Sequence, residues 1–307
     1  MALGISVVIP TYNRADMLVR CVGSILATDY PALEVIVVDD CSPDGTAERV
    51  AREFGSDRRV RCIRNARNLQ LAASRNAGAR AATREWIFFL DDDNIVHPDI
   101  FEEFEKTSRR RPNAAFIAPL AIHRRQGSEG EIWTIGSDFN RWTSQPKDRA
   151  SHLPLKDLPA DVTEYDTTYS PNGFLVRREA FERVGGCDES FGIMFDESDF
   201  GWRIGEAGYE MVISTGARTD HYGMVEPGCV SRLRYLGIEK PGRTYLFARN
   251  RLRFARRHFS VLQALSVALV FAPLSCAYYC AVAVRNRRPD IAWAYLKGTV
   301  RGLLGLL

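Results

Sequence analysis

The first hundred residues alternate between short apolar runs and segments with helical spacing, and this pattern restricts the fold more than any other feature. The apolar runs are residues 5–10, 33–40, 60–63 and 86–90. The segments between them, residues 14–27, 44–54 and 71–83, carry apolar or small residues at helical spacing, and residues 97–110 continue the pattern. Continuous apolar strands separated by helices predict a parallel sheet that is covered on both faces.

The second half of the chain is less regular. Residues 114–122 and 173–178 predict two further strands, and residues 196–209 predict a helix that ends at Gly208. Residues 136–168 are rich in loop-forming residues, so no secondary structure is assigned to them. An apolar content of 46% and a charged content of 26% are typical of a globular protein and exclude a disordered one.

Charge is distributed unevenly along the chain. From residue 228 to the end there are 14 Lys and Arg against 2 Asp and Glu, whereas the preceding part has 27 against 36. A basic tail on an acidic body favours an anionic partner surface, either membrane or nucleic acid. The seven cysteines form no CxxC pair and the N-terminus has no signal-peptide pattern, which favours reduced thiols in the cytosol.

The tail also contains a long apolar run, because the 24 residues from 261 to 284 carry no charge. A helix of that length, at ~1.5 Å per residue, would cross the ~30 Å hydrocarbon core of a bilayer. Basic clusters flank both ends, so a single span would place one of them on the wrong side. With Pro273 in the middle, we expect a broken, interfacial or re-entrant helical hairpin with both ends on the cytosolic face. A core helix is the alternative.

Polar residues follow three of the predicted strands, where parallel sheets bind ligands. Three consecutive aspartates at the end of the fourth strand repel one another unless a divalent cation or full solvation compensates. A solvated loop is therefore the other interpretation. The strand-end residues are Pro10, Thr11, Tyr12 and Arg14 after the first strand, Asp39 and Asp40 after the second, and Asp91, Asp92 and Asp93 after the fourth.

Six segments of the chain occur in a familiar order: SVVIPTYNRADML, EVIVVDDCSPDGT, NLQLAASRNAG, FFLDDDN, GGCDESFGIMFDESDFGWRIGEAGY and DHYG. Over residues 4–225 the sequence resembles the inverting family 2 glycosyltransferases of the GT-A fold. The resemblance implies an α/β fold, with a Rossmann-like, mostly parallel sheet flanked by helices and a C-terminal helical, membrane-associated segment. It implies a catalytic domain over residues 1–225, with a nucleotide-binding half (1–110) and an acceptor half (111–225), and a tail over 226–307.

The resemblance also implies an activity. One sugar would pass from a UDP-, dTDP- or GDP-sugar to a hydroxyl of a lipid-linked or membrane-proximal glycan, assisted by Mn²⁺ or Mg²⁺. The tail resembles that of rhamnosyltransferase-like members. The enzyme would then lie at the cytoplasmic face of the cell membrane, bound to an anionic lipid surface and to no nucleic acid.

Residue roles follow from the same resemblance. Glu197 occupies the position of the catalytic base, with Asp196 as the competing candidate; the family often has Asp there. A helix N-terminus would also favour either carboxylate. Gln70 stands where the family frequently has Gly. Asp40 is expected to accept from the base of the nucleotide, with Asp39 supporting Asp40, and the residues lining that pocket are Pro10, Thr11, Tyr12 and Arg14. Arg75 is expected near the nucleotide or diphosphate, and Asp91 and Asp92 against the donor. The expected metal ligands are Asp93, Asp91 and His221.

Three other functions remain open. A processive polysaccharide synthase would carry a Q-x-x-R-W element and several transmembrane helices, which this sequence does not show. A non-catalytic sugar-nucleotide-binding protein would be expected to lack Glu197 or Asp93. Nucleic-acid binding by the Arg-rich tail is compatible with its composition, but the adjacent apolar run favours lipid. Trp133, Trp142 and Tyr169, in the expected acceptor region, either stack on sugars or belong to the core.

Overall fold

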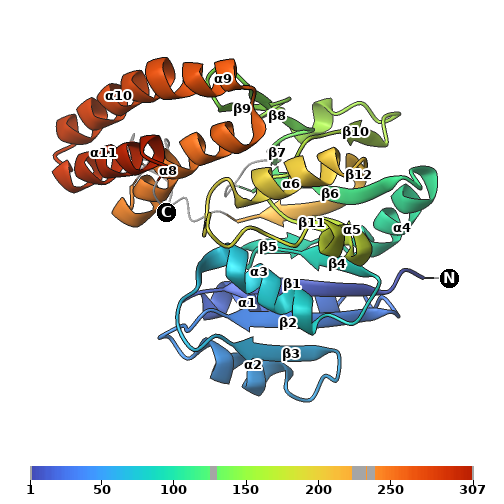
Figure 1. The fold of residues 1–307 in the computed structure, drawn as a ribbon. Coiled ribbons are helices and arrows are strands. Elements are labelled where there is room, and N and C mark those ends of the chain that lie inside the picture. The colour runs from blue at the N-terminus through green and yellow to red at the C-terminus, as the bar shows by residue number, and fades with distance from the viewer. Residues whose placement is uncertain (1, 125–129, 223–232, 234–238, 306–307) are drawn as a thin grey trace.

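The computed structural model describes residues 2–124, 130–222, 233 and 239–305 (Figure 1). A ten-stranded sheet in the order β10-β12-β6-β11-β4-β1-β2-β3, with β5 on β12 and β7 on β6, forms the centre of the molecule. Its strands are β1 (Ile5–Thr11), β2 (Leu33–Asp39), β3 (Val60–Arg64), β4 (Trp86–Phe89), β5 (Asn94–Val96), β6 (Ala114–His123), β7 (Glu131–Ile132), β10 (Glu164–Asp166), β11 (Phe174–Arg177) and β12 (Glu210–His221).

The parallel pairing predicted for the first four strands is confirmed. β1 lies between β2 and β4 and is parallel to both, and β3 continues the parallel order beyond β2. The second half of the sheet is mixed, because β11 is antiparallel to both β4 and β6. One continuous sheet therefore carries both expected halves of the catalytic domain.

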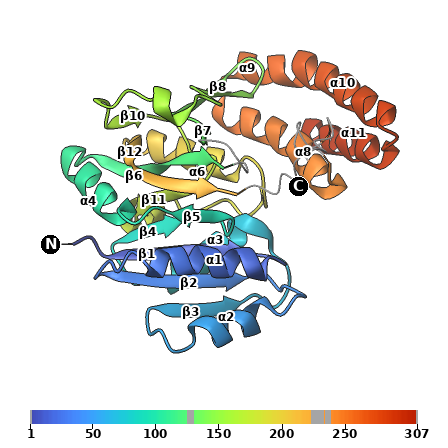
Figure 2. The ribbon, with the colours of Figure 1, turned by 180° about the vertical axis from the view of Figure 1, so that it is seen from behind.

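Helices cover both faces of the sheet, as the apolar strands require. Side chains of alternating strand positions enter two separate cores, so Val7 belongs to one and Val8 to the other. The first core is covered by α1 (Ala15–Leu26), α2 (Thr46–Phe54) and α4 (Ile100–Arg110), and the second by α3 (Gln70–Ala81), α5 (Arg178–Arg183) and α6 (Asp196–Glu206). Figure 1 shows α3, α5 and α6 in front, and Figure 2 shows α1 and α4 from the opposite side.

Two parts of the second half differ from the sequence-based prediction. The segment 136–168 contains a small sheet of β8 (Ser137–Asn140) and β9 (Gln145–Asp148), a short helix η1 (Leu155–Asp157) and β10. The long strand β12 was not predicted, although it pairs in parallel with β6. Its apolar pattern is interrupted because polar residues such as Ser214 and Thr219 are buried and the register shifts between Ser214 and Arg218.

The tail forms a helical module of α8 (Pro241–His258), α9 (Val261–Ser266), η2 (Val267–Phe271), α10 (Ala272–Arg285) and α11 (Pro289–Leu303). Of the expected arrangements, a hairpin within the apolar run is wrong, since the helix is continuous from Val261 to Arg285. The π-helical turn η2 ends two residues before Pro273, and such local changes of hydrogen-bond register are common beside proline in a helix. The hairpin is instead formed by α10 and α11. The expected domain boundary at 225/226 lies outside the described residues.

The helical module packs on itself and on the catalytic body. α8 and α11 approach closely at Gly298, where an added Cβ would lie 2.3 Å from the carbonyl oxygen of Tyr245. On its other side, Phe254 of α8 enters a core with Phe191 and Tyr169. In Figures 1 and 2 the module lies on the side of the sheet opposite the N-terminus.

Much of the apolar surface of this module is exposed. Within the described chain, the helix from Val261 to Arg285 alone is long and apolar enough to cross a membrane, and 33% of its most apolar window is buried in the protein. The exposed apolar side chains are Val261, Leu262, Leu265, Leu269, Val270, Leu274, Tyr278 and Val284 on this helix, and Trp293, Leu296, Val300 and Leu303 on α11.

Candidate active site

The ends of β1 and β4 bring the aspartate cluster together with Thr11 and Arg14. Because β1 pairs in parallel with β4, their carboxyl ends meet at one edge of the sheet. The Thr11 hydroxyl donates to Asp92 at 2.7 Å, and the Arg14 guanidinium lies 3.0 Å from a carboxylate oxygen of both Asp92 and Asp93. Arg14 therefore compensates the repulsion within the cluster. Of the expected pocket residues, Pro10 and Thr11 are buried and Tyr12 is exposed.

The environments of Asp92 and Asp93 shift their pKa values in opposite directions. Burial raises the pKa of Asp92 to about 6, although Arg14 and Thr11 oppose the shift. Burial also disfavours the ionised form of Asp93, but the hydrogen bond and charge of His221, together with Arg14, outweigh it and lower the pKa of Asp93. Of these two carboxylates, Asp93 is thus the better suited to stay ionised.

Arg75 connects the aspartate cluster to the start of α6. Its guanidinium contacts Asp196 at 2.8 Å, Glu197 at 2.5 Å and Asp91 at 3.1 Å, and only 1% of its side chain is exposed. Protein carboxylates enclose the Arg75 guanidinium, which partly compensates their charge at the centre of the site. Its contact with Asp91 leaves it beside the aspartate cluster, and its expected place near the nucleotide or diphosphate stays a prediction.

Glu197 and Asp196 differ in their access to solvent. The Glu197 side chain is 17% exposed and that of Asp196 2%, so a hydroxyl group can approach Glu197 more readily. Burial, opposed by Arg75 and reinforced by Asp196, raises the pKa of Glu197 to about 8. The pKa of Asp196 is raised by the same cause, again against the effect of Arg75. A partly exposed carboxylate with a raised pKa is suited to act as a general base.

The turn before α6 sets the position of both carboxylates. Met194 and Phe195 have φ of 70° and 65°, in the left-handed region that non-glycine residues rarely adopt. Two such residues in succession cost roughly 1–3 kcal/mol each, and the surrounding structure must compensate. This turn leads directly into α6, so that Asp196 and Glu197 lie in the first turn of the helix, where the helix dipole favours negative charge.

Asp39 and Asp40 organise the loops that follow β2. The Asp40 carboxylate accepts from the backbone N–H groups of Leu69 and Gln70 and from the side chain of Asn65, each at 2.8 Å. Asp39 accepts from the backbone of Ser42 at 2.9 Å. Asp40 thus holds the N-terminus of α3, whereas Oδ2 of Asp39 is buried without a hydrogen-bond partner among the described residues. The expected contacts of both residues with the nucleotide stay predictions.

Gln70 adopts a left-handed conformation, with φ of 71°. This is the conformation that glycine adopts readily, so the loop has a glycine-like shape despite the side chain. Its backbone N–H bonds Asp40, which stabilises the unusual conformation. The departure from the family pattern at this position therefore leaves the loop shape intact.

His221 and Asp93, two of the three expected metal ligands, lie side by side. Nε2 of His221 is 3.5 Å from a carboxylate oxygen of Asp93, because β12 pairs with β5 directly after the aspartate cluster. Asp91 contacts Arg75 at 3.1 Å. Among the described residues no three His, Cys, Asp or Glu side chains lie together, so the structure brings Asp93 to His221, and Asp91 as a third ligand stays a prediction.

Sequence reasoning missed an asparagine pair that joins the cluster to the expected acceptor side. The amides of Asn94 and Asn172 exchange two hydrogen bonds, at 3.0 and 2.7 Å, and both residues are buried. Of the expected aromatic residues, Trp133 stacks on His123 at 4.6 Å and lies 4.9 Å from the ring of His221.

The other two aromatic residues are divided between core and surface. Tyr169 is buried in a core with Phe139, whereas Trp142 is 54% exposed.

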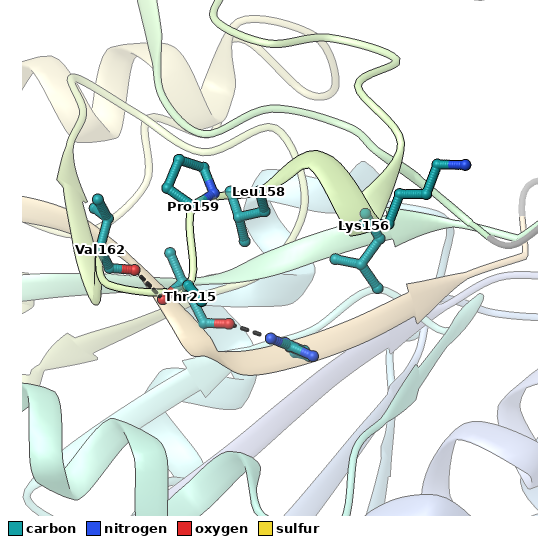
Figure 3. Close-up of a pocket in the computed structure, with 8 residues that line it drawn as sticks. Lys156, Leu158, Pro159, Val162 and Thr215 are labelled. Carbon is teal, nitrogen blue, oxygen red and sulfur yellow. Dashed lines mark hydrogen bonds between the residues drawn. The ribbon is translucent and has the colours of Figure 1, made fainter.

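A separate pocket lies away from these residues. It is lined by Leu155, Lys156, Leu158, Pro159, Ala160, Val162, Thr215 and Arg218, none of them an expected site residue. Figure 3 shows the Thr215 hydroxyl donating to the carbonyl of Val162 across its floor. The carboxylates that support chemistry lie elsewhere, so this pocket is not the candidate active site.

Comparison with known proteins identifies the family and the fold. The family model "Glycosyl transferase family 2" matches residues 6–185, more than half of the chain. The succinoglycan biosynthesis protein ExoO of Rhizobium meliloti is 45% identical over 202 residues, which are 66% of this chain and 53% of that protein. The glycosyltransferase GlyG of Streptococcus pneumoniae is 30% identical over 135 residues, 44% of this chain and 45% of that protein. The matched regions thus span about half the length of these relatives.

Solved structures share the fold at low sequence identity. GalNAc-T7 with UDP, GalNAc and Mn²⁺ superposes with a TM-score of 0.66 at 18% identity, over 98% of this chain and 57% of that one. The mannosyltransferase PcManGT of Pyrobaculum calidifontis, in complex with GDP-Man and Mn²⁺, gives a TM-score of 0.61 at 18% identity, over 99% of this chain and 88% of that one. The α/β architecture predicted from the sequence is therefore confirmed.

Proposed function

Because this chain belongs to glycosyl transferase family 2 and is a glycosyltransferase of the GT-A fold, we propose that it transfers one sugar, with inversion, from a nucleoside-diphosphate sugar to a hydroxyl of a lipid-linked or membrane-proximal glycan. One observation carries the proposal. At a single edge of the sheet, Arg75 joins Glu197 and Asp196 of α6 to the aspartate cluster that follows β4. A general base and a donor-binding cluster are thereby adjacent.

Glu197 performs the proton transfer in this proposal. The acceptor oxygen forms a bond to the anomeric carbon while the bond from that carbon to the diphosphate oxygen breaks, and the hydroxyl proton passes to the carboxylate of Glu197. Arg75 holds this carboxylate in place and neutralises its neighbours Asp196 and Asp91. A single displacement needs no covalent intermediate and inverts the configuration.

Asp93 and His221 fit a divalent cation, Mn²⁺ or Mg²⁺. Asp93 would supply an oxygen ligand, which both ions accept, and His221 would supply an imidazole nitrogen. Phosphate oxygens and water complete a site with few protein ligands. When bound, the cation supplies charge neutralisation for the departing diphosphate. Arg14 and Thr11 hold Asp92 beside this pair, which keeps the cluster compact. The solved relatives contain Mn²⁺ with UDP or GDP-Man, which supports this choice and leaves the donor among UDP-, dTDP- and GDP-sugars.

We expect release of a nucleoside diphosphate from one member of a sugar-nucleotide panel, with membrane extract as acceptor and Mn²⁺ or Mg²⁺ present. Asp93→Asn should lower this release at least about tenfold, because a neutral amide binds a hard cation poorly. Asp57→Asn, the same change at a surface loop carboxylate paired with Arg59, should leave the rate unchanged. Donor binding without release from any panel member would instead support a non-catalytic sugar-nucleotide-binding protein.

The helical module supports placement of the enzyme at the cytoplasmic face of the cell membrane. Exposed apolar side chains on α9, α10 and α11 lie close in sequence to the exposed cations Arg285, Arg287, Lys297 and Arg301. This combination is typical of a helix that lies in the interface of an anionic bilayer. We propose that the module rests on the membrane and brings the active site to a lipid-linked acceptor.

Vesicle co-sedimentation tests this placement. Arg285→Gln/Arg287→Gln should weaken binding to anionic vesicles by ~2 kcal/mol, about 1 kcal/mol for each charge, and Leu269→Ser/Leu274→Ser should weaken binding to anionic and neutral vesicles alike. Arg52→Gln, an equally exposed cation on α2, is the matched control and should bind as the wild type does. Strongly salt-dependent binding to DNA, with none to vesicles, would overturn the membrane proposal in favour of nucleic acid.

A further inference from the structure

Asn250 of α8 binds the turn that precedes the carboxylates of α6. Its side chain is fully buried, and its amide nitrogen lies 2.9 Å from the carbonyl oxygen of Phe191, 3.0 Å from that of Ile193 and 2.8 Å from that of Met194. Its amide oxygen accepts from Nε of Arg249 at 2.9 Å. This contact fixes the orientation of the amide, since the reverse orientation would place its oxygen against three carbonyl oxygens.

Two further contacts from α8 hold the same region on either side of the carboxylates. Before them, Nη2 of Arg249 donates to the carbonyl of Ser190 at 2.7 Å. After them, Asp199 of α6 is fully buried and lies 2.8 Å from Nε2 of His258, while Arg203 occupies its other oxygen. The residues that carry the carboxylates are therefore held at both ends by one helix of the tail.

The turn requires such support. Met194 and Phe195 are consecutive left-handed residues without a glycine, and a backbone of this kind persists only where its surroundings determine it. The carbonyl groups bound by Asn250 belong to this turn or directly precede it. Removing this donor would leave the partly buried carbonyls of Ile193 and Met194 without their Asn250 partner and allow the turn to relax, which would move Glu197 relative to Arg75.

We propose that Asn250 is a positioning residue for the carboxylate base, so that the helical module completes the active site as well as supporting its location. The inference rests on the proposed role of Glu197. This inference gives α8 a function in catalysis. The charge and hydropathy of the tail do not suggest that function, because the residue responsible is a single buried amide, Asn250, within a basic helix. The mechanism is indirect: Asn250 touches only backbone of the turn, and the turn fixes Glu197 at the N-terminus of α6.

The test compares Asn250→Asp with Leu252→Ala. Asp has the same shape as Asn but no N–H donors. Leu252 packs against α11 at Gly302 and lies in the apolar core that includes Phe191, so its truncation weakens the packing of α8 without removing a hydrogen bond to the turn. We expect Asn250→Asp to lower kcat about 10- to 100-fold, with the donor KM changed less than about twofold, because misplacing a catalytic group affects the chemical step. Leu252→Ala should keep the wild-type kcat under conditions where it remains folded.

Hydrogen–deuterium exchange provides a readout that does not depend on activity. The peptide spanning residues 188–199 should exchange faster in Asn250→Asp than in Leu252→Ala when the two are compared at equal global stability. If Asn250→Asp does not fold, Arg249→Met removes the neighbouring contact to Ser190 and should produce the same local increase in exchange.

The outcomes separate this inference from the proposed function. Unchanged exchange in residues 188–199 for the variants at 250 and 249 would overturn the positioning role, whatever the activity of the wild type. A wild type that releases no nucleoside diphosphate, but whose variants show the faster local exchange, would contradict the proposed function and retain the role of Asn250 in holding the turn.

Discussion

Glu197→Gln is expected to lower kcat by about 10²–10⁴-fold, the usual contribution of a general base. The substituted amide keeps the shape of the side chain, and its oxygen still accepts from Arg75, so the melting temperature should change little. The donor KM should also be retained, because the lost step is proton removal from the acceptor. Steady-state release of nucleoside diphosphate, measured with donor and acceptor varied separately, checks these expectations.

The pH dependence of the wild type belongs to the same prediction. A base must be ionised to accept a proton, and burial raises the pKa of Glu197 to about 8. The value of kcat/KM should therefore rise with pH and level off above about pH 8, and this acidic limb should be absent from the residual activity of Glu197→Gln.

Asp196→Asn is the matched control for that substitution. Asp196 is enclosed and bound to Arg75, so we expect a smaller loss of kcat and a retained acidic limb. If the large loss and the missing limb appear in Asp196→Asn, and Glu197→Gln remains active, the base is Asp196 and the assignment moves by one residue.

Arg75→Met is expected to destabilise the protein by about 3–5 kcal/mol near pH 8 and to abolish activity, because it leaves buried carboxylates without their counter-ion. Asp91, Asp196 and Glu197 all contact this guanidinium. Without it, the pKa values of Asp196 and Glu197, which burial already raises, should rise further above those in the unfolded chain. Groups of this kind stabilise the fold at low pH and lose that contribution as the pH rises through the folded pKa.

The loss of stability should therefore be smaller at pH 5.5 than at pH 8, and chemical denaturation at both values measures it. Arg61→Met is the control, since Arg61 forms a half-exposed ion pair with Glu34 and its loss should cost about 1 kcal/mol or less. Arg75→Lys keeps the charge without the planar fork and should be intermediate. A destabilisation of Arg75→Met that does not vary with pH would show that lost packing, rather than uncompensated charge, is responsible.

Local patterns in the sequence were sufficient for the first four predicted strands and for the carboxylates that follow them. The apolar runs ending at Thr11, Asp39 and Phe89 are strands because buried parallel strands need apolar side chains on both faces. Their parallel order then places the polar residues that follow them at one edge. The juxtaposition of His221 with Asp93 was predicted from the family resemblance, and the structure brings the two together through pairing of β12 with β5.

Other features depend on contacts between residues far apart in the chain. The resemblance predicts that Arg75 lies near the nucleotide or diphosphate, but its sequence neighbours do not reveal its protein partners Asp196 and Glu197, which are more than 100 residues away in the chain. β12 was missed since its pairing with β6 buries polar residues that interrupt the period of a strand. Pro273 favoured a hairpin within the apolar run, but the helix continues through it, with a π-helical turn just before it.

The sequence by itself determined the family, the α/β architecture and the identity of the residues that carry charge at the site. These depend on side-chain type and on periodicity, which are local properties of the chain. Only the tertiary structure decided how the charges are compensated: Arg75 holds the carboxylates of α6, and Asn250 supports the turn before them. A buried charge or carbonyl takes whichever partner the completed fold brings within hydrogen-bonding distance, and no pattern along the chain records that distance.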